Sequence, residues 1–152
     1  MELILWRHAE AEEGEPDAGR KLTSKGQKQA AKMARWLDSN LPETCRILVS
    51  PAVRTQETVA HLHRKFKTLP ELDVGASIED VLTAANWPNS REPVLVVGHQ
   101  PYLGLVAAHV LGTPLQECSV RKGNVWWITQ KPRENDMQTY LKAIMAPDLV
   151  VK

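Results

Sequence analysis

Short apolar runs alternate along this chain with longer segments in which apolar residues recur every three or four positions. The runs at residues 2–7, 46–50 and 94–97 are rich in Leu, Ile and Val, and polar residues bound them. This pattern is typical of strands that are buried on both faces of a parallel sheet. The amphipathic segments between the runs predict helices, so the sequence predicts an α/β fold with three layers, α/β/α, around a mostly parallel central sheet.

Two of the expected helices carry capping signals. Ser24 and Gln27 have the spacing of a capping box, and Ser77 and Asp80 repeat it before a shorter third helix, which we expect to end near residues 87–88. The first of these helices is expected to bury an apolar stripe, which consists of Ala30, Ala34, Leu37 and Leu41.

Two further helices each follow a strand directly. Ser50 and Pro51 predict the cap and the first helical residue of the second helix, and Pro101 and Gly112 mark the start and the end of the fourth. The buried face expected for the second helix is Thr55, Val59, Leu62 and Phe66.

The pattern changes in the last part of the chain. "NVWWITQ" and "MQTYLKAIM" are strand-like runs joined by the turn-rich segment "KPREND". They predict an antiparallel hairpin that completes the sheet.

Length and composition limit the possible classes of protein. A chain of 152 residues with 43% hydrophobic and 24% charged residues fits a single globular domain, residues 1–152. The net charge of +1 arises from scattered charges, which disfavours nucleic acid as a partner. Cys45 and Cys118 form no disulfide framework or zinc motif, and no apolar run is long enough to span a membrane, so we expect a cytoplasmic protein with no membrane partner.

Basic and imidazole side chains follow the expected strands. Arg7 and His8 end the first strand, Arg54 lies in the first turn of the helix after the second, and His99 ends the strand "VLVVG". Parallel strands would bring these residues to one edge of the sheet, where ligands bind in such folds. Arg20, on the loop before the first helix, could reach the same edge. Such a cationic cluster is stable only around an anion.

A phosphoryl group fits this cluster, because its oxygens accept paired bonds from guanidinium groups and from N–H groups at helix starts. A neutral imidazole is a competent nucleophile toward phosphorus, which is the role we expect for His8. His99 could then stabilise the charge of the phosphoryl group during its transfer.

Four segments together resemble a known family. "LWRHAEAE", "GRKLTSKG", "VSPAVRTQET" and "VVGHQPYLG" are similar, in order and spacing, to the histidine phosphatase (phosphoglycerate mutase-like) superfamily, above all to its SixA-type phosphohistidine phosphatases. The resemblance implies a phosphoglycerate mutase-like fold, His8 as the phosphorylated nucleophile, and catalysis without a metal or a cofactor. It also implies a phosphate pocket made of Arg7, Arg20, Arg54 and His99.

The sequence departs from the broader superfamily at two points. Ala9 stands where glycine is usual, which is common among SixA-type sequences. The short chain also leaves no room for the inserted segment that carries an acidic proton donor in larger members. The acidic residues in the corresponding interval show no spacing that selects one of them as a general acid; they are Glu71, Asp73, Glu79 and Asp80.

The missing acid bears on the substrate. An alkoxide leaving group needs a proton in the transition state, whereas the imidazole of a phosphohistidine leaves as a neutral group. The sequence therefore favours phosphohistidine on a partner protein as the substrate. We separately expect the enzyme to be a monomer. The alternatives are a general phosphomonoesterase or phosphate-ester mutase acting on a small phosphorylated substrate, and a non-catalytic phosphate-binding or phosphoprotein-binding module.

Overall fold

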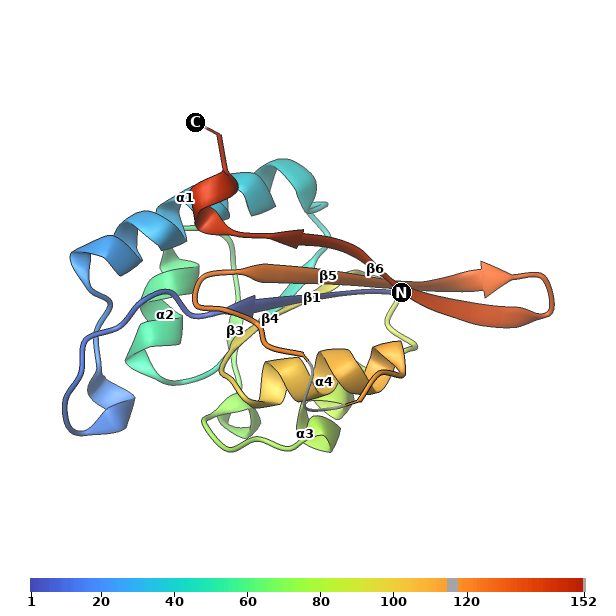
Figure 1. Cartoon of the computed structure of the whole chain (residues 1–152), viewed down its shortest axis with the longest axis horizontal. Coiled ribbons are helices and arrows are strands. Elements are labelled where there is room, and N and C mark those ends of the chain that lie inside the picture. Colours follow the sequence, from blue (N-terminus) through green and yellow to red (C-terminus); the bar gives the residue numbers. More distant parts are fainter. Residues whose placement is uncertain (115–117, 152) are drawn as a thin grey trace.

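The computed structural model of the protein describes residues 1–114 and 118–151. Its centre is a six-stranded sheet with the strand order β3-β2-β4-β1-β5-β6 (Figure 1). The pairs β1–β4, β2–β4 and β2–β3 are parallel, whereas β5 joins β1, and β6 joins β5, in antiparallel fashion. The expected sheet, mostly parallel with a late antiparallel hairpin, is confirmed. The strands are β1 (Glu2–Arg7), β2 (Arg46–Val49), β3 (Lys67–Thr68), β4 (Val94–Gly98), β5 (Val125–Arg133) and β6 (Asp136–Met145).

Helices cover the sheet on both faces. α1 (Ser24–Asn40) and α2 (Val53–Ala60) pack on one face, and α3 (Ile78–Ala85) and α4 (Tyr102–Leu111) pack on the other (Figure 1). Two separate apolar clusters fill the spaces between the layers. The expected three-layer α/β/α architecture is therefore confirmed. None of the helices in the described part of the chain is long and apolar enough to cross a membrane.

Strand β1 is the centre of both apolar clusters. Successive strand residues point to opposite faces of a sheet, so Ile4 and Trp6 join the cluster under α1 and α2, while Leu3 and Leu5 join the cluster under α3 and α4. All four side chains are fully buried. The apolar run at the start of the chain thus fixes the position of Arg7, which follows directly.

The start of α1 differs from the expected capping box by one residue. Thr23, and not Ser24, is the N-cap, and its hydroxyl accepts a hydrogen bond from the backbone N–H of Gly26 at 2.9 Å. The Thr23 hydroxyl lies close enough to the Glu10 side chain to hydrogen-bond with it as well, which favours Thr23 over its neighbour. The capping box of Ser77 and Asp80 in α3 is confirmed, and that helix ends at Ala85.

Helix α2 begins later than expected. Ala52 is its N-cap, so neither Ser50 nor Pro51 has the predicted capping role. The Ser50 hydroxyl instead lies 2.7 Å from Nε2 of His99. The fourth helix agrees with the prediction, because Pro101 is its N-cap and Gly112 ends it in the left-handed conformation.

Helix α2 also ends earlier than the sequence predicts. It stops at Ala60, and Phe66, expected on its buried face, is 39% exposed. The chain turns at His63, which has a φ of 54°, and Arg64 then donates hydrogen bonds to the carboxyl-terminal end of α1 and the loop after it. These tertiary contacts outweigh the helical pattern of the sequence.

The hairpin exists as predicted, but its turn is shorter. Strand β5 continues to Arg133, so only Glu134 and Asn135 of the segment "KPREND" separate the strands. Cross-strand pairing extends through Pro132 and Met137, and the hairpin projects beyond the helices (Figure 1). The short strand β3 is an addition that the exposed residues Lys67 and Thr68 did not signal.

The close approach of α1 to the segment after β1 requires a glycine at position 26. A Cβ atom built on Gly26 would overlap the carbonyl oxygen of Glu10, two residues after His8. We expect Gly26→Ala to lower the free energy of unfolding by about 1–3 kcal/mol, because the backbone must shift to admit the methyl group. Denaturant titration measures this change. Gly19→Ala is the matched control, since its Cβ would meet only Pro16 at an ordinary 3.7 Å, and an equal loss in both variants would contradict the interpretation.

Candidate active site

The ends of three parallel strands bring the predicted site residues together. Arg7 pairs in register with Gly98, and the backbone N–H of His8 donates a hydrogen bond to the Gly98 carbonyl at 3.1 Å. Because His99 follows Gly98, the rings of His8 and His99 lie side by side, with their centroids 5.4 Å apart. The side chains of both histidines are buried, with 5% and 2% exposed.

The hydrogen bonds of His8 define its tautomer. Nδ1 lies 2.8 Å from the backbone carbonyl oxygen of Ala9, which can only accept, so Nδ1 carries the proton. Nε2 then has a free lone pair, and the Nε–H group of Arg54 donates to it at 3.3 Å. The imidazole is therefore held as a base or a nucleophile, with Nε2 as its reactive atom.

The second imidazole is held by the segment that follows β2. Nε2 of His99 lies 2.7 Å from the Ser50 hydroxyl, which also accepts a hydrogen bond from the backbone N–H of Ala52. Within residues 1–114 and 118–151, Nδ1 of His99 has no hydrogen-bond partner although it is buried. Buried polar groups in folded proteins are nearly always paired, so this nitrogen is available to a ligand.

Arg7 offers a second buried atom of this kind. Its Nη1 donates to the Val120 carbonyl at 3.2 Å, while its Nε has no partner among the described residues. Arg7 therefore has hydrogen-bonding capacity left for a further acceptor beside the two imidazoles.

Arg54 is buried in the first turn of α2 and reaches from His8 to the loop after β1. Besides His8, its guanidinium donates to the backbone oxygen of Asp17 at 2.9 Å and to the Asp17 carboxylate at 3.2 Å. Asp17 begins the short 3-10 helix Asp17–Gly19. The Arg54 side chain is thus fixed at both ends.

Arg20 lies farther out than the other predicted site residues. Its guanidinium donates to the Asp17 carboxylate at 3.0 Å and to the Glu12 carbonyl at 2.7 Å. Arg20 and Arg54 therefore share one carboxylate. The structure brings together Arg7, His8, Arg54 and His99, and it joins Arg20 to this group only through Asp17.

Burial has the largest influence on both imidazoles. It lowers the pKa of His8 from 6.5 to about 3, with further lowering by the nearby His99, Arg54 and Arg7, and the bond to the Ala9 carbonyl opposes the change. Burial likewise lowers the pKa of His99 to about 4; Arg54 and Arg7 add to this effect and Asp17 opposes it. Both rings are therefore neutral at pH 7.

Asp17 and Ser50 were not identified from the sequence as part of the site. The hydrogen bond from Arg20, followed by that from Arg54, lowers the pKa of the Asp17 carboxyl. A possible signal was the Asp-x-x-Arg spacing of Asp17 and Arg20, since a local ion pair forms at this distance in a single turn. Ser50 could have been noted because it directly follows a strand at the binding edge of the sheet.

Two of the four acidic residues between positions 71 and 80 hydrogen-bond to nearby backbone N–H groups. The Asp80 carboxylate accepts from the Ser77 backbone in the capping box, and the Asp73 carboxylate accepts from the Val74 backbone. In the part of the chain that the structure describes, no three His, Cys, Asp or Glu side chains gather into a group that could hold a metal ion.

Comparisons with known proteins identify relatives of this chain. The sequence profile of the histidine phosphatase superfamily (branch 1) matches residues 3–76. A phosphohistidine phosphatase SixA homolog of Haemophilus influenzae is 32% identical over 130 residues, which cover 74% of this chain and 78% of that protein. The phosphohistidine phosphatase SixA of Escherichia coli is 31% identical over 121 residues, covering 72% of this chain and 74% of that protein.

Solved structures extend the likeness to nearly the whole chain. The protein histidine phosphatase SixA, solved with tungstate, has a TM-score of 0.76 at 25% identity and covers 97% of this chain and 98% of its own. A phosphoserine phosphatase of Entamoeba histolytica has a TM-score of 0.75 at 14% identity, covers 99% of each chain, and shows the shared fold alone. This chain therefore belongs to the histidine phosphatase superfamily, and within it to the SixA type. It is a phosphatase, a hydrolase of phosphoryl groups.

The two buried imidazoles make folding stability depend on pH. In the unfolded chain they bind protons below pH 6.5, whereas in the folded chain they stay neutral down to about pH 4 and 3. The unfolded state thus binds more protons in this interval, and the free energy of unfolding falls as the pH drops from 6.5 toward 4, by about 1.4 kcal/mol per pH unit for each ring.

Denaturant titrations between pH 4 and pH 8 measure this dependence. We expect His99→Gln to have a shallower slope than the wild type. His109→Gln is the control, because it makes the same side-chain change at an exposed position away from the two buried rings. Parallel curves for the wild type and His99→Gln would contradict the interpretation.

Proposed function

We propose that this phosphatase hydrolyses phosphohistidine on a partner protein and works through a covalent phosphohistidine intermediate at His8. The observation that carries the proposal is the state of His8: a neutral ring with its Nδ1 proton bound to the Ala9 carbonyl and its Nε2 lone pair facing Arg54. A nucleophile of this kind splits one difficult displacement into two easier ones.

In the first step, Nε2 of His8 attacks the phosphorus atom of the substrate. A new P–N bond forms while the P–N bond of the substrate breaks, and the bonding electron pair returns to the imidazole of the partner protein. The reacting form of the substrate is the phosphoimidazolium, whose other nitrogen has taken up a proton from water, so the ring leaves as a neutral imidazole. The bond that forms and the bond that breaks are of the same type, so neither side is strongly favoured.

The charge on the phosphoryl oxygens is held by the groups around His8. Arg54 turns its Nε–H donor from His8 Nε2 to an oxygen, and Arg7 contributes the Nε–H that lacks a protein partner. We assign a proton to Nδ1 of His99, with the Ser50 hydroxyl donating to Nε2, so that this ring donates to a third oxygen. Arg20 supports the pocket through Asp17. Donors placed in this way each contribute about two to three orders of magnitude in rate.

In the second step, water attacks the phosphoryl group on His8. The P–Nε2 bond breaks, its electron pair returns to Nε2, and inorganic phosphate takes up the oxygen and the protons of the water. His8 regains its starting tautomer, because the proton stays on Nδ1 throughout, hydrogen-bonded to the Ala9 carbonyl. No step requires a metal ion or a cofactor.

Asp17 supports phosphohistidine over an alkyl phosphate as the substrate. Its carboxylate bonds to both Arg54 and Arg20, and these bonds lower its pKa, so it is ionised and a poor proton donor at neutral pH. An alkoxide leaving group needs such a donor, and a neutral imidazole does not.

We place the proposed site in one catalytic domain, residues 1–152, which acts as a monomer in the cytoplasm. Cys45 and Cys118 are free thiols, which agrees with a reducing compartment.

Replacement of the nucleophile should abolish turnover. We expect His8→Ala to lose all hydrolysis of phosphohistidine and the wild type to carry a phosphoryl label on His8 after a rapid quench in alkali, where the P–N bond survives. Mass spectrometry of the digested protein locates the label. His109→Gln should keep both activity and label, and a label on any other residue would exclude the proposed intermediate.

The rate of hydrolysis should depend on the chemistry of the leaving group. We expect kcat/KM for phosphohistidine to exceed that for glycerol phosphate by about 10²–10⁴, the range that a general acid contributes. Steady-state assays of both compounds at pH 7 measure this ratio. Equal rates would favour a general phosphomonoesterase, and formation of a new phosphate ester would favour a mutase.

A further inference from the structure

A wide basic groove opens beside the proposed site, between α1 and the segment that leads into β5. It encloses about 840 Å³, and among residues 1–114 and 118–151 six basic and two acidic side chains line it. Its outer cations, which we call the groove cations, are Lys25, Lys28, Lys32, Arg121 and Lys122.

The groove concentrates charge in a chain that is nearly neutral as a whole. The protein has 19 Lys and Arg residues against 18 Asp and Glu residues. None of the groove cations forms an ion pair with an acidic side chain in residues 1–114 and 118–151. One of the two acids, Glu10, lies within hydrogen-bond distance of the Thr23 hydroxyl and so has a local partner. The groove is thus a surface of unbalanced positive charge.

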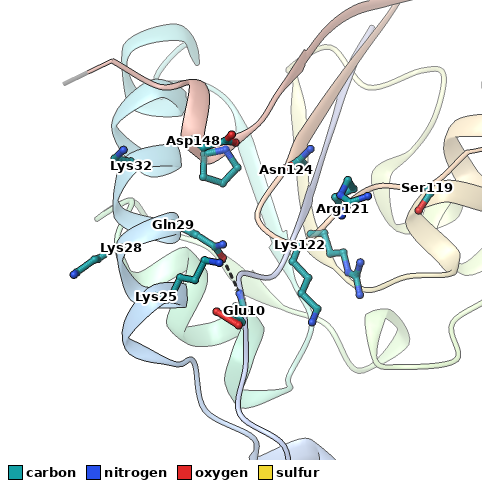
Figure 2. Close-up of a pocket in the computed structure, with 12 residues that line it drawn as sticks. Glu10, Lys25, Lys28, Gln29, Lys32, Ser119, Arg121, Lys122, Asn124 and Asp148 are labelled. Atoms are coloured by element: carbon teal, nitrogen blue, oxygen red, sulfur yellow. Dashed lines mark hydrogen bonds between the residues drawn. The ribbon is translucent and has the colours of Figure 1, made fainter.

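The groove is continuous with the proposed phosphate pocket. Arg7 lines it and also lies directly before His8. Burial lowers the pKa of Arg7 most, and the positive charges of Arg54 in the proposed pocket and Arg121 in the groove add to this effect. Figure 2 shows Lys25 and Gln29 directed toward Glu10, Lys122 on the opposite wall, and Lys28 and Lys32 on the outer side of α1. A substrate whose phosphoryl group reaches His8 therefore extends along these cations.

The geometry points to an acidic protein surface as the occupant, and we propose that the groove docks acidic residues beside the phosphohistidine of the partner. The three lysines of α1 extend over about 10 Å of helix, since each residue rises about 1.5 Å. Four of the five groove cations are lysines, which act as mobile point charges, whereas a small phosphate is usually held by the fixed fork of arginine. Pockets for small molecules are also lined mostly by apolar side chains, whereas eight of the twelve described residues that line this groove are charged.

Nucleic acid fits the groove less well than an acidic protein does. Single-stranded nucleic acids are held by aromatic side chains on which bases stack, and none of the described residues that line the groove is aromatic.

This inference rests on the proposed function, and the test uses three substrates. They are free phosphohistidine, a phosphohistidine peptide with Asp and Glu neighbours, and the same peptide with Ser neighbours. We expect the wild type to have a kcat/KM for the acidic peptide about tenfold above that for the neutral peptide, with a difference that shrinks as salt is added, because electrostatic steering is screened.

The variant Lys25→Glu/Lys122→Glu should remove this preference and leave the turnover of free phosphohistidine unchanged, since Figure 2 shows these two lysines on facing walls of the groove. The matched control is Lys67→Glu/Lys131→Glu, which makes the same charge change at exposed sites outside the groove and should keep the preference. A fluorescent single-stranded oligonucleotide is added as a competitor of the acidic peptide.

The possible outcomes distinguish the docking proposal, a nucleic-acid site and the proposed function from one another. If the wild type cleaves free phosphohistidine but treats both peptides alike, or if the control loses the preference equally, the docking proposal is wrong and the proposed function stands. If the oligonucleotide displaces the acidic peptide and binds more tightly than it, the groove is a nucleic-acid site. If none of the three phosphohistidine substrates is cleaved, the proposed function fails and the docking proposal fails with it.

Discussion

The site depends on the parallel register between β1 and β4. This register places Arg7 opposite Gly98 and so brings His8 and His99 side by side at the carboxyl ends of two strands whose apolar residues are buried. Their burial keeps both imidazoles neutral, and neutrality makes a nucleophile possible at pH 7. The apolar side chains of β1 therefore contribute to the chemistry indirectly, because they fix the strand that carries His8.

The contacts of Gly98 show how closely this arrangement is packed. A Cβ atom at this position would overlap the hydroxyl of Tyr102, whose ring packs edge-on against His99. The Tyr102 hydroxyl in turn donates to the Leu72 carbonyl. The second imidazole is thus supported from α4 and from the loop before α3, as well as by Ser50.

The sequence was sufficient for the fold class because β1, β2 and β4 are short apolar runs whose pattern reflects burial on both faces. It was also sufficient to predict that Arg7, His8, Arg54 and His99 meet, since each follows a strand at the same edge of the sheet. Features that depend on tertiary contacts were not predictable from a local pattern. The early end of α2, the change of Ser50 from a helix cap to a partner of His99, and the position of Arg20 on Asp17 all belong to this group.

The carboxylate that Arg54 and Arg20 share has a consequence for the effect of dissolved salt. The Asp17 side chain is 53% exposed, so ions in the solvent reach its contacts with the two guanidiniums and screen them. The contact between Arg54 and His8 is buried and is screened much less. Ionic strength therefore acts on the outer end of the Arg54 side chain more than on the end beside His8.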